Sequence, residues 1–153
     1  MKKIKDIHLS LVSVAIGIFT TLMIFFPALV VKDTENVYSG IEVVFGHQFI
    51  NLGGLGSGEI KFSILNLLAY SLPLIGAITV LLIKKNKKIS TIIFTIAIFL
   101  LLLVPVFTIV HVTILDNINV IDVDWGYSLG LLVAVLLSLI NVGIGLVRLI
   151  KRN

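Results

Sequence analysis

The stretch Lys84-Lys85-Asn86-Lys87-Lys88 decides the fold, because this short basic segment joins two long apolar runs. Each run is too hydrophobic for a soluble protein. Lysine and arginine collect on the inner side of a bilayer. We therefore predict that residues 84–88 form the cytoplasmic turn between two membrane-spanning helices.

The composition also indicates a multi-pass membrane protein. The chain has 153 residues, of which 58% are hydrophobic and only 13% are charged, and its mean hydropathy is +1.16. In soluble domains about a quarter of the residues are charged. There is no cysteine, which excludes disulfides, thiolate nucleophiles and Cys-ligated metals. We assign the net charge of +4 to membrane edges and lipid headgroups and expect no nucleic-acid partner.

Four apolar segments are long enough to cross a bilayer, at about residues 7–31, 62–83, 89–115 and 126–150. They leave two extracellular segments, 32–61 and 116–125, opposite the turn 84–88. The predicted fold is an all-α integral membrane protein with four transmembrane helices, a single domain over residues 1–153.

Charge placement gives the orientation. Ten of the 12 Lys and Arg residues fall on the side of the turn and two, Lys32 and Lys61, on the other side, which takes seven of the eight acidic residues. Lys and Arg placement sets the orientation of membrane helices. We therefore expect both termini in the cytoplasm. The content of Lys, Ile and Asn suggests the plasma membrane of a bacterium.

The extracellular segments show strand-like patterns. Residues 41–45 alternate between two glycines, and a second extended piece is expected at 48–50 before the glycine-rich turn 51–58. A similar alternation predicts one strand over 121–125. Together these pieces predict a small β-rich cap of two or three strands.

Two stripes of small and polar residues predict close helix packing. Residues at three- and four-residue spacing share one helical face, and small side chains let membrane helices approach. The stripes offer a face for another membrane protein or a second copy of this chain. Their members are Ser13 and Gly17 in the first span and Gly130, Ala134, Ser138, Asn141 and Gly145 in the fourth.

A few polar residues suggest a pocket in the outer half of the bundle. No Asp, Glu, Lys or Arg lies deep in an expected span, whereas ion and proton transporters usually hold ionisable residues there. Asn66, Tyr70, His111 and Tyr127 could together form an outer-leaflet pocket for a lipid or peptide. The alternative is that Asn66 and Tyr70 only form hydrogen bonds between helices.

We predict no catalytic, cofactor or metal site. The spacing Gly54-x-Gly56-x-Gly58 lacks the lysine and the βαβ context of a phosphate-binding loop. His47 and His111 could meet an acidic residue on the outer side, such as Asp122 or Glu42, but the spacing does not require a metal. Cation binding by the outer acidic residues stays open.

The layout of four spans, a longer β-rich first loop and a short second loop resembles that of the claudins. The resemblance is one of architecture, because the first loop lacks the paired cysteines and the tryptophan motif of that family. A junction-forming function is therefore not implied. Fold analogy does not establish function.

We therefore expect a non-enzymatic interaction protein, an accessory or scaffold subunit of a membrane complex. The alternative is a small transporter, channel or lipid- or peptide-binding protein that uses the outer pocket.

Overall fold

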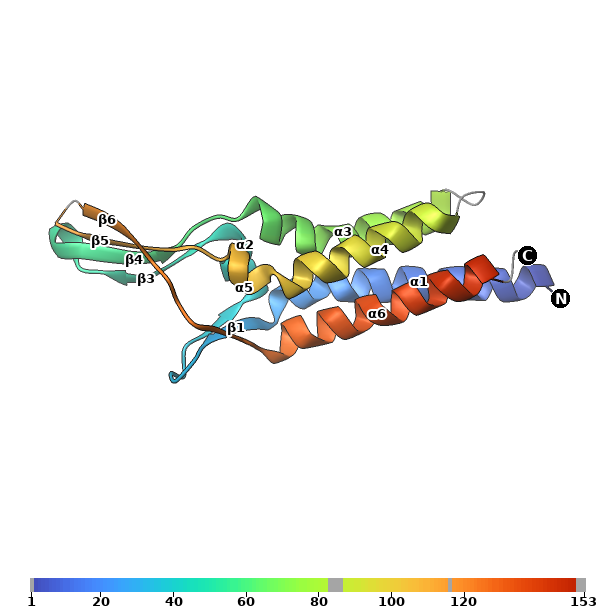
Figure 1. Cartoon of the computed structure of the whole chain (residues 1–153), viewed down its shortest axis with the longest axis horizontal. Coiled ribbons are helices and arrows are strands. Elements are labelled where there is room, and N and C mark those ends of the chain that lie inside the picture. The colour runs from blue at the N-terminus through green and yellow to red at the C-terminus, as the bar shows by residue number, and fades with distance from the viewer. Residues whose placement is uncertain (1, 83–86, 116, 151–153) are drawn as a thin grey trace.

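The molecule has a helical bundle at one end and two β-sheets at the other (Figure 1). The computed structural model describes residues 2–82, 87–115 and 117–150. In the bundle, α1 and α4 each pack against both α3 and α6. The four helices are α1 (Lys2–Leu22), α3 (Ile64–Leu82), α4 (Lys87–Leu102) and α6 (Leu129–Ile150). Helix α1 begins and helix α6 ends at the end far from the sheets (Figure 1).

The predicted all-α fold with four transmembrane helices is wrong. The described residues form seven strands in two antiparallel sheets. Three segments in the described part of the chain, Ile7–Phe25, Ile64–Leu82 and Leu129–Ile150, are long and apolar enough to cross a membrane. Helix α4 has 16 residues, which extend about 24 Å and fall short of a hydrocarbon core of roughly 30 Å. The resemblance to claudins rested on four spans and is withdrawn.

The first expected span, 7–31, ends in a strand. Helix α1 stops at Leu22, a single 3₁₀ turn, η1 (Met23–Phe25), follows, and β1 starts at Pro27. Proline has no N–H and disfavours the helical conformation in the residue before it. The valines that end the run are β-branched and favour a strand.

The third expected span, 89–115, is divided in the same way. Helix α4 ends at Leu102, the short helix α5 (Val104–Phe107) carries a proline in its first turn, and β5 (Val110–Ile114) follows. The sequence Val-His-Val-Thr-Ile is apolar, but its β-branched residues favour a strand. Hydropathy alone does not separate these two outcomes. Pairing with β4 accompanies the strand conformation.

The smaller sheet lies against the bundle and has the strand order β2-β1-β7. Its strands are β1 (Pro27–Val31), β2 (Val37–Ser39) and β7 (Trp125–Tyr127). Strand β1 follows α1 and β7 precedes α6, so two helices that pack together are continued by two strands that pair. Ala28 and Leu29 of β1 are fully buried and share the hydrophobic core with Leu131 of α6.

The larger sheet projects away from the bundle and has the strand order β3-β4-β5-β6 (Figure 1). Its strands are β3 (His47–Asn51), β4 (Gly56–Ile60), β5 (Val110–Ile114) and β6 (Asn117–Ile121). Here β4 precedes α3 and β5 follows α4 and α5, so the α3–α4 pair is also continued by a strand pair. The cap is therefore larger than the two or three strands predicted.

Residues 41–45 form a helix and not the predicted strand. Helix α2 (Gly40–Phe45) is capped by Ser39, whose hydroxyl accepts a hydrogen bond from the Glu42 N–H, while the Glu42 carboxylate accepts one from the Ser39 N–H. This capping box needs a Ser followed three residues later by a Glu. The sequence therefore carries a helix signal beside the alternation that predicts a strand.

Of the other two predicted strands, one is confirmed and one is divided between the two sheets. The piece expected at 48–50 is confirmed as part of β3. The strand expected over 121–125 is divided, because β6 ends at Ile121 in the larger sheet and β7 starts at Trp125 in the smaller one. Residues 122–124 connect the two sheets.

The bundle is closely packed where α1, α3 and α6 meet at Gly17. A Cβ atom on Gly17 would lie 2.7 Å from the Cβ of Ala77 and 2.8 Å from the carbonyl oxygen of Pro73, so a larger residue does not fit without movement. Beside this contact, the Ser13 hydroxyl donates to Asn141 Oδ1 at 2.7 Å, and Asn141 Nδ2 donates to the Ser13 carbonyl at 3.0 Å. These bonds join α1 to α6 in the interior.

Gly17→Ala should lower the free energy of unfolding by about 1–3 kcal/mol, because the added methyl group overpacks the contact between α1 and α3. Gly143→Ala is the matched control, since a Cβ on Gly143 of α6 would meet no atom within 4 Å. This control should be neutral or stabilising. Stability is measured by denaturant titration in detergent, followed by circular dichroism. Equal stability of the two variants would contradict the packing at Gly17.

Candidate functional site

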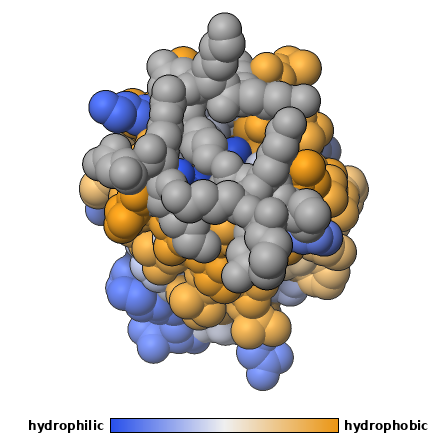
Figure 2. Space-filling model, turned by 90° about the vertical axis from the view of Figure 1, so that its right-hand side faces the viewer, coloured by the Kyte–Doolittle hydropathy of each residue, from blue (hydrophilic) through white to orange (hydrophobic). Residues whose placement is uncertain are grey.

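The outer flank of the bundle is apolar. Seen from the end opposite the sheets, apolar side chains form much of the visible surface, with hydrophilic ones toward the rim (Figure 2). Phe19 of α1, Phe99 of α4 and Leu136 of α6 are exposed by 58%, 63% and 58%. A helix on the surface of a soluble protein usually carries polar residues there. This flank suits lipid tails, and three of the helical segments are long enough to cross a membrane.

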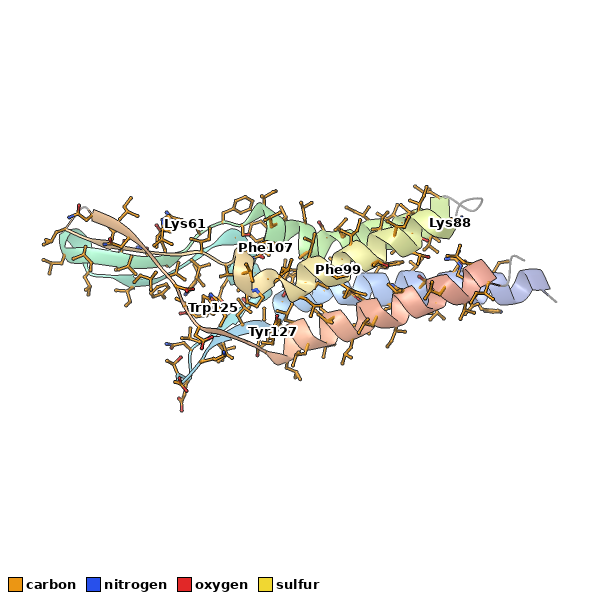
Figure 3. The ribbon with its side chains drawn as sticks, viewed as in Figure 1. Lys61, Lys88, Phe99, Phe107, Trp125 and Tyr127 are labelled. Carbon is orange, nitrogen blue, oxygen red and sulfur yellow. The ribbon has the colours of Figure 1, made fainter. Side chains whose placement is uncertain are left out.

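Charged side chains lie toward the two ends of the molecule. Lys88 lies at the end of the bundle far from the sheets, and Lys61 lies beside the larger sheet (Figure 3). The region of the sheets holds one further lysine, Lys32, against six described carboxylates, which gives it a net negative charge. The carboxylates are Asp33, Glu35, Glu42, Glu59, Asp122 and Asp124.

Two ion pairs and one histidine–carboxylate contact link the described polar groups around the sheets. Lys32 Nζ lies 2.7 Å from Asp124 Oδ1, and Lys61 pairs with Glu59. Hydrogen bonding to Asp124, together with its charge, raises the pKa of Lys32 above its ordinary value. His47 Nδ1 lies 3.3 Å from Glu42 Oε1. Within the described part of the chain, Asp122 has no ion pair.

Glu42 links helix α2 to the larger sheet. Its Oε2 atom accepts hydrogen bonds from the N–H and the hydroxyl of Ser39 at 2.7 and 2.8 Å, while Oε1 faces His47. Partial burial pushes the pKa of Glu42 upward, but the bonds from Ser39 and the charge of His47 outweigh it and hold the pKa below the ordinary 4.5. The carboxylate therefore stays ionised and keeps α2 in place at the base of β3.

Tyr38 joins the two sheets through its aromatic ring. Its ring centre lies 5.9 Å from that of His47, 6.4 Å from that of Phe49 and 5.7 Å from that of Trp125, all edge to face. Two of these rings belong to β3 and one to β7. Burial, and then the charge of Glu42, raise the pKa of Tyr38, so the ring stays neutral. Aromatic pairs of this geometry stabilise by about 0.5–1.5 kcal/mol each.

Of the four residues expected in an outer pocket, Asn66 and Tyr70 lie on one face of α3 and are buried. Asn66 Nδ2 donates to the Val43 carbonyl at 3.3 Å and to Thr108 Oγ1 at 3.0 Å. Tyr70 belongs to the hydrophobic core. Asn66 Oδ1 and the Tyr70 hydroxyl are buried without a hydrogen-bond partner among the described residues.

The structure places the other two pocket residues in different sheets. His111 is in β5, paired with Glu59 on one side and Val120 on the other. Tyr127 is in β7 and its hydroxyl donates to the Leu102 carbonyl at 2.7 Å (Figure 3). The structure thus brings Asn66 and Tyr70 together on α3 and places His111 and Tyr127 on separate sheets.

The residues of the two small-residue stripes all lie inside the chain's own bundle. Each of them is buried, and the Ser13–Asn141 bonds connect the two stripes. The stripe on α6 continues to Arg148, which is 4% exposed. Sequence reasoning placed Arg148 only among the charges at the membrane edge. Its position three residues after Gly145 on the buried face was the signal for its burial.

The larger sheet exposes apolar side chains at its far end and along one edge. Ile118 and Val120 of the edge strand β6 are exposed by 67% and 68%. Leu55 ends the 3₁₀ turn η2 (Gly53–Leu55), and Leu115 lies in the turn after β5. The Leu115 N–H donates to the Leu55 carbonyl at 3.4 Å, and the two residues are exposed by 65% and 68%. Large exposed apolar patches mark interaction sites in soluble regions of proteins.

A metal site finds no support in the described residues. No group of three or more His, Cys, Asp or Glu side chains lies close enough there to hold a metal ion. Glu42 and His47 lie close together, but no third such side chain among the described residues joins them.

Comparison with known proteins gives no match: no family model, no curated protein and no solved structure is significantly similar to the chain. The structure itself defines a class: an apolar helical bundle that carries two antiparallel sheets at one end.

Glu42→Gln should reduce stability at neutral pH and make it less dependent on pH. The folded-state pKa is lowered, so the carboxylate contributes stability above its unfolded-state pKa, and this contribution is lost as the pH falls through the folded-state value. The difference from wild type should vanish in acid well below pH 4.5. Glu35→Gln, at an exposed position between β1 and β2, is the control. Parallel pH profiles for Glu42→Gln and wild type would contradict this role.

Asn66→Leu should lower the free energy of unfolding by about 1–3 kcal/mol, because it leaves the Val43 carbonyl and the Thr108 hydroxyl without the donor that Asn66 provides. Tyr70→Phe should be neutral or stabilising, since the lost hydroxyl has no partner among the described residues. Both variants are compared by denaturant titration in detergent. A larger loss for Tyr70→Phe than for Asn66→Leu would show that the hydroxyl is bound by something else.

Proposed function

We propose that this is a membrane-anchored interaction protein, an accessory or scaffold subunit whose larger sheet holds a partner beside the membrane. The observation that carries the proposal is the projecting sheet with large aliphatic side chains exposed along β6 and in the loops at its far end. The bundle offers little specificity of its own, because its outer face is apolar and its small-residue stripes are used internally.

The proposed position places the bundle in lipid and the sheets in water. Open sheet edges do not occur within the hydrocarbon region, because their N–H and C=O groups would have no partner. The larger sheet has two open edges, β3 and β6, so it belongs outside. The basic segments near the termini and at 84–88 favour the cytoplasmic side for the opposite end. Both termini are then cytoplasmic, in the plasma membrane of a bacterium.

A second candidate function is the binding of a small polar ligand within the bundle near α2. Asn66 Oδ1 and the Tyr70 hydroxyl are the observation in its favour, since both are buried and lack a partner among the described residues. In that case, Tyr70→Phe would remove ligand binding while the protein stays folded. The apolar sheet is the larger feature and carries the first proposal.

A photo-cross-linking amino acid at Val120 should capture one partner protein in native membranes, whereas the same amino acid at Phe99 should capture lipid. Val120 lies on the projecting sheet and Phe99 on the outer face of α4. Purification in mild detergent and mass spectrometry identify the products and their ratio. A cross-link from Phe99 to the same partner, or none from Val120, would contradict a partner held by the sheet.

A further inference from the structure

The two edges of the larger sheet are not equally open. Strand β3 has a bulge between Gln48 and Ile50, and the ring of Tyr38 packs against His47 and Phe49. Bulges and covering groups are the usual protections of an edge strand.

Strand β6 has none of these protections among its described residues. It pairs with β5 in continuous register from Asn117 to Ile121, with no bulge. All five of its residues, Asn-Ile-Asn-Val-Ile, are exposed, and none of them is charged or proline. An edge strand with these features readily pairs with another extended chain.

The side chains of β6 favour β-branched residues in the added strand. Ile118 and Val120 are two residues apart and therefore point to the same face of the sheet. Side chains directly opposite one another on neighbouring strands are in contact, and β-branched side chains pack well on a pleated surface. An added strand that alternates β-branched and polar residues would place its β-branched side chains beside Ile118 and Val120 and its polar ones beside Asn119.

The charge around β6 favours a basic partner. Asp122 directly follows the strand, is exposed and has no ion pair among the described residues. The region of the sheets as a whole carries an excess of carboxylates over lysines. A Lys or Arg at the end of an added strand would lie beside Asp122.

The same charges disfavour a second copy of this chain as the occupant. Asp116 and Asp122 flank β6 in the sequence. Two copies joined edge to edge would bring together two sheet regions in which the described carboxylates outnumber the lysines. Like charges directly opposite one another destabilise a strand pair. A different protein with basic residues at these positions meets no such repulsion.

We propose that the open edge of β6 takes up an extended segment of a partner protein, with alternating β-branched residues and a Lys or Arg beside Asp122. This rests on the proposed function and names the partner's chemistry. Main-chain hydrogen bonds to β6 supply affinity, and alternate side chains supply specificity, as in other cases of strand addition.

The test uses the full chain in nanodiscs and a fluorescent peptide of alternating Val and Thr flanked by Lys, with a Glu-flanked peptide as the comparison. The Lys-flanked peptide should bind about fivefold more tightly. Asp122→Lys should reverse this preference. Amide hydrogen exchange should slow in residues 117–121 when the peptide is bound.

Matched edge variants locate the site. Ile118→Lys should abolish peptide binding, because a lysine on the edge opposes strand addition. Gln48→Lys, an exposed position on the other edge strand, should leave binding unchanged. Equal affinity for the two peptides, absence of binding, or protection on β3 would overturn the proposal. So would a nanodisc-bound dimer that Ile118→Lys converts to a monomer, because a second copy would then occupy the edge.

Cross-linking in the edge variant distinguishes failure of the β6 proposal from failure of the proposed function. If the cross-link from Val120 to a native partner persists in the Ile118→Lys variant, the sheet holds a partner by another surface, and only the β6 proposal fails. If no protein cross-links to the sheet, the proposed function itself fails.

Discussion

The contact at Gly17 between α1, α3 and α6 is the constraint on which the rest of the structure depends. It brings Ser13 and Asn141 within hydrogen-bond distance and fixes α1 beside α6. Strand β1 leaves α1 and strand β7 enters α6, so these strands are already neighbours when the chain leaves the bundle. The α3–α4 pair positions β4 and β5 in the same way. Each pair of packed antiparallel helices is thus continued by a pair of antiparallel strands.

This arrangement explains why sequence reasoning located the helices better than their ends. The expected segments 62–83 and 126–150 agree closely with α3 and α6, because each is one long apolar run that stays helical over its length, in α3 with Pro73 inside it. The segments 7–31 and 89–115 were too long by a strand each. Apolar β-branched residues suit a membrane helix and a buried strand equally well. The partner strand, which is distant in sequence, decides between them.

The candidate site shows the same limit. The spacing of Asn66 and Tyr70 places them on one helical face, which the sequence predicts, but their partners Val43 and Thr108 come from segments far away in the chain. The capping box of Ser39 and Glu42 was visible in the sequence, whereas the approach of His47 to Glu42 depends on the fold of β3. Local signals predict which residues share an element. They do not predict which elements meet.

The two surfaces of the molecule differ in what they can recognise. In lipid, contact between apolar helix faces gains little, because lipid tails are as apolar as the side chains they would replace. With the bundle in lipid, as proposed, the flank around Phe99 has no strong driving force to bind another protein. In water, exposed apolar area such as that of Ile118 and Val120 is unfavourable. Burying it stabilises a complex by roughly 25 cal/mol per Å². Strand β6 adds unpaired backbone groups that require a partner of defined direction and register. In the proposed function, affinity and specificity therefore coincide on the sheet, while the apolar bundle serves as its anchor.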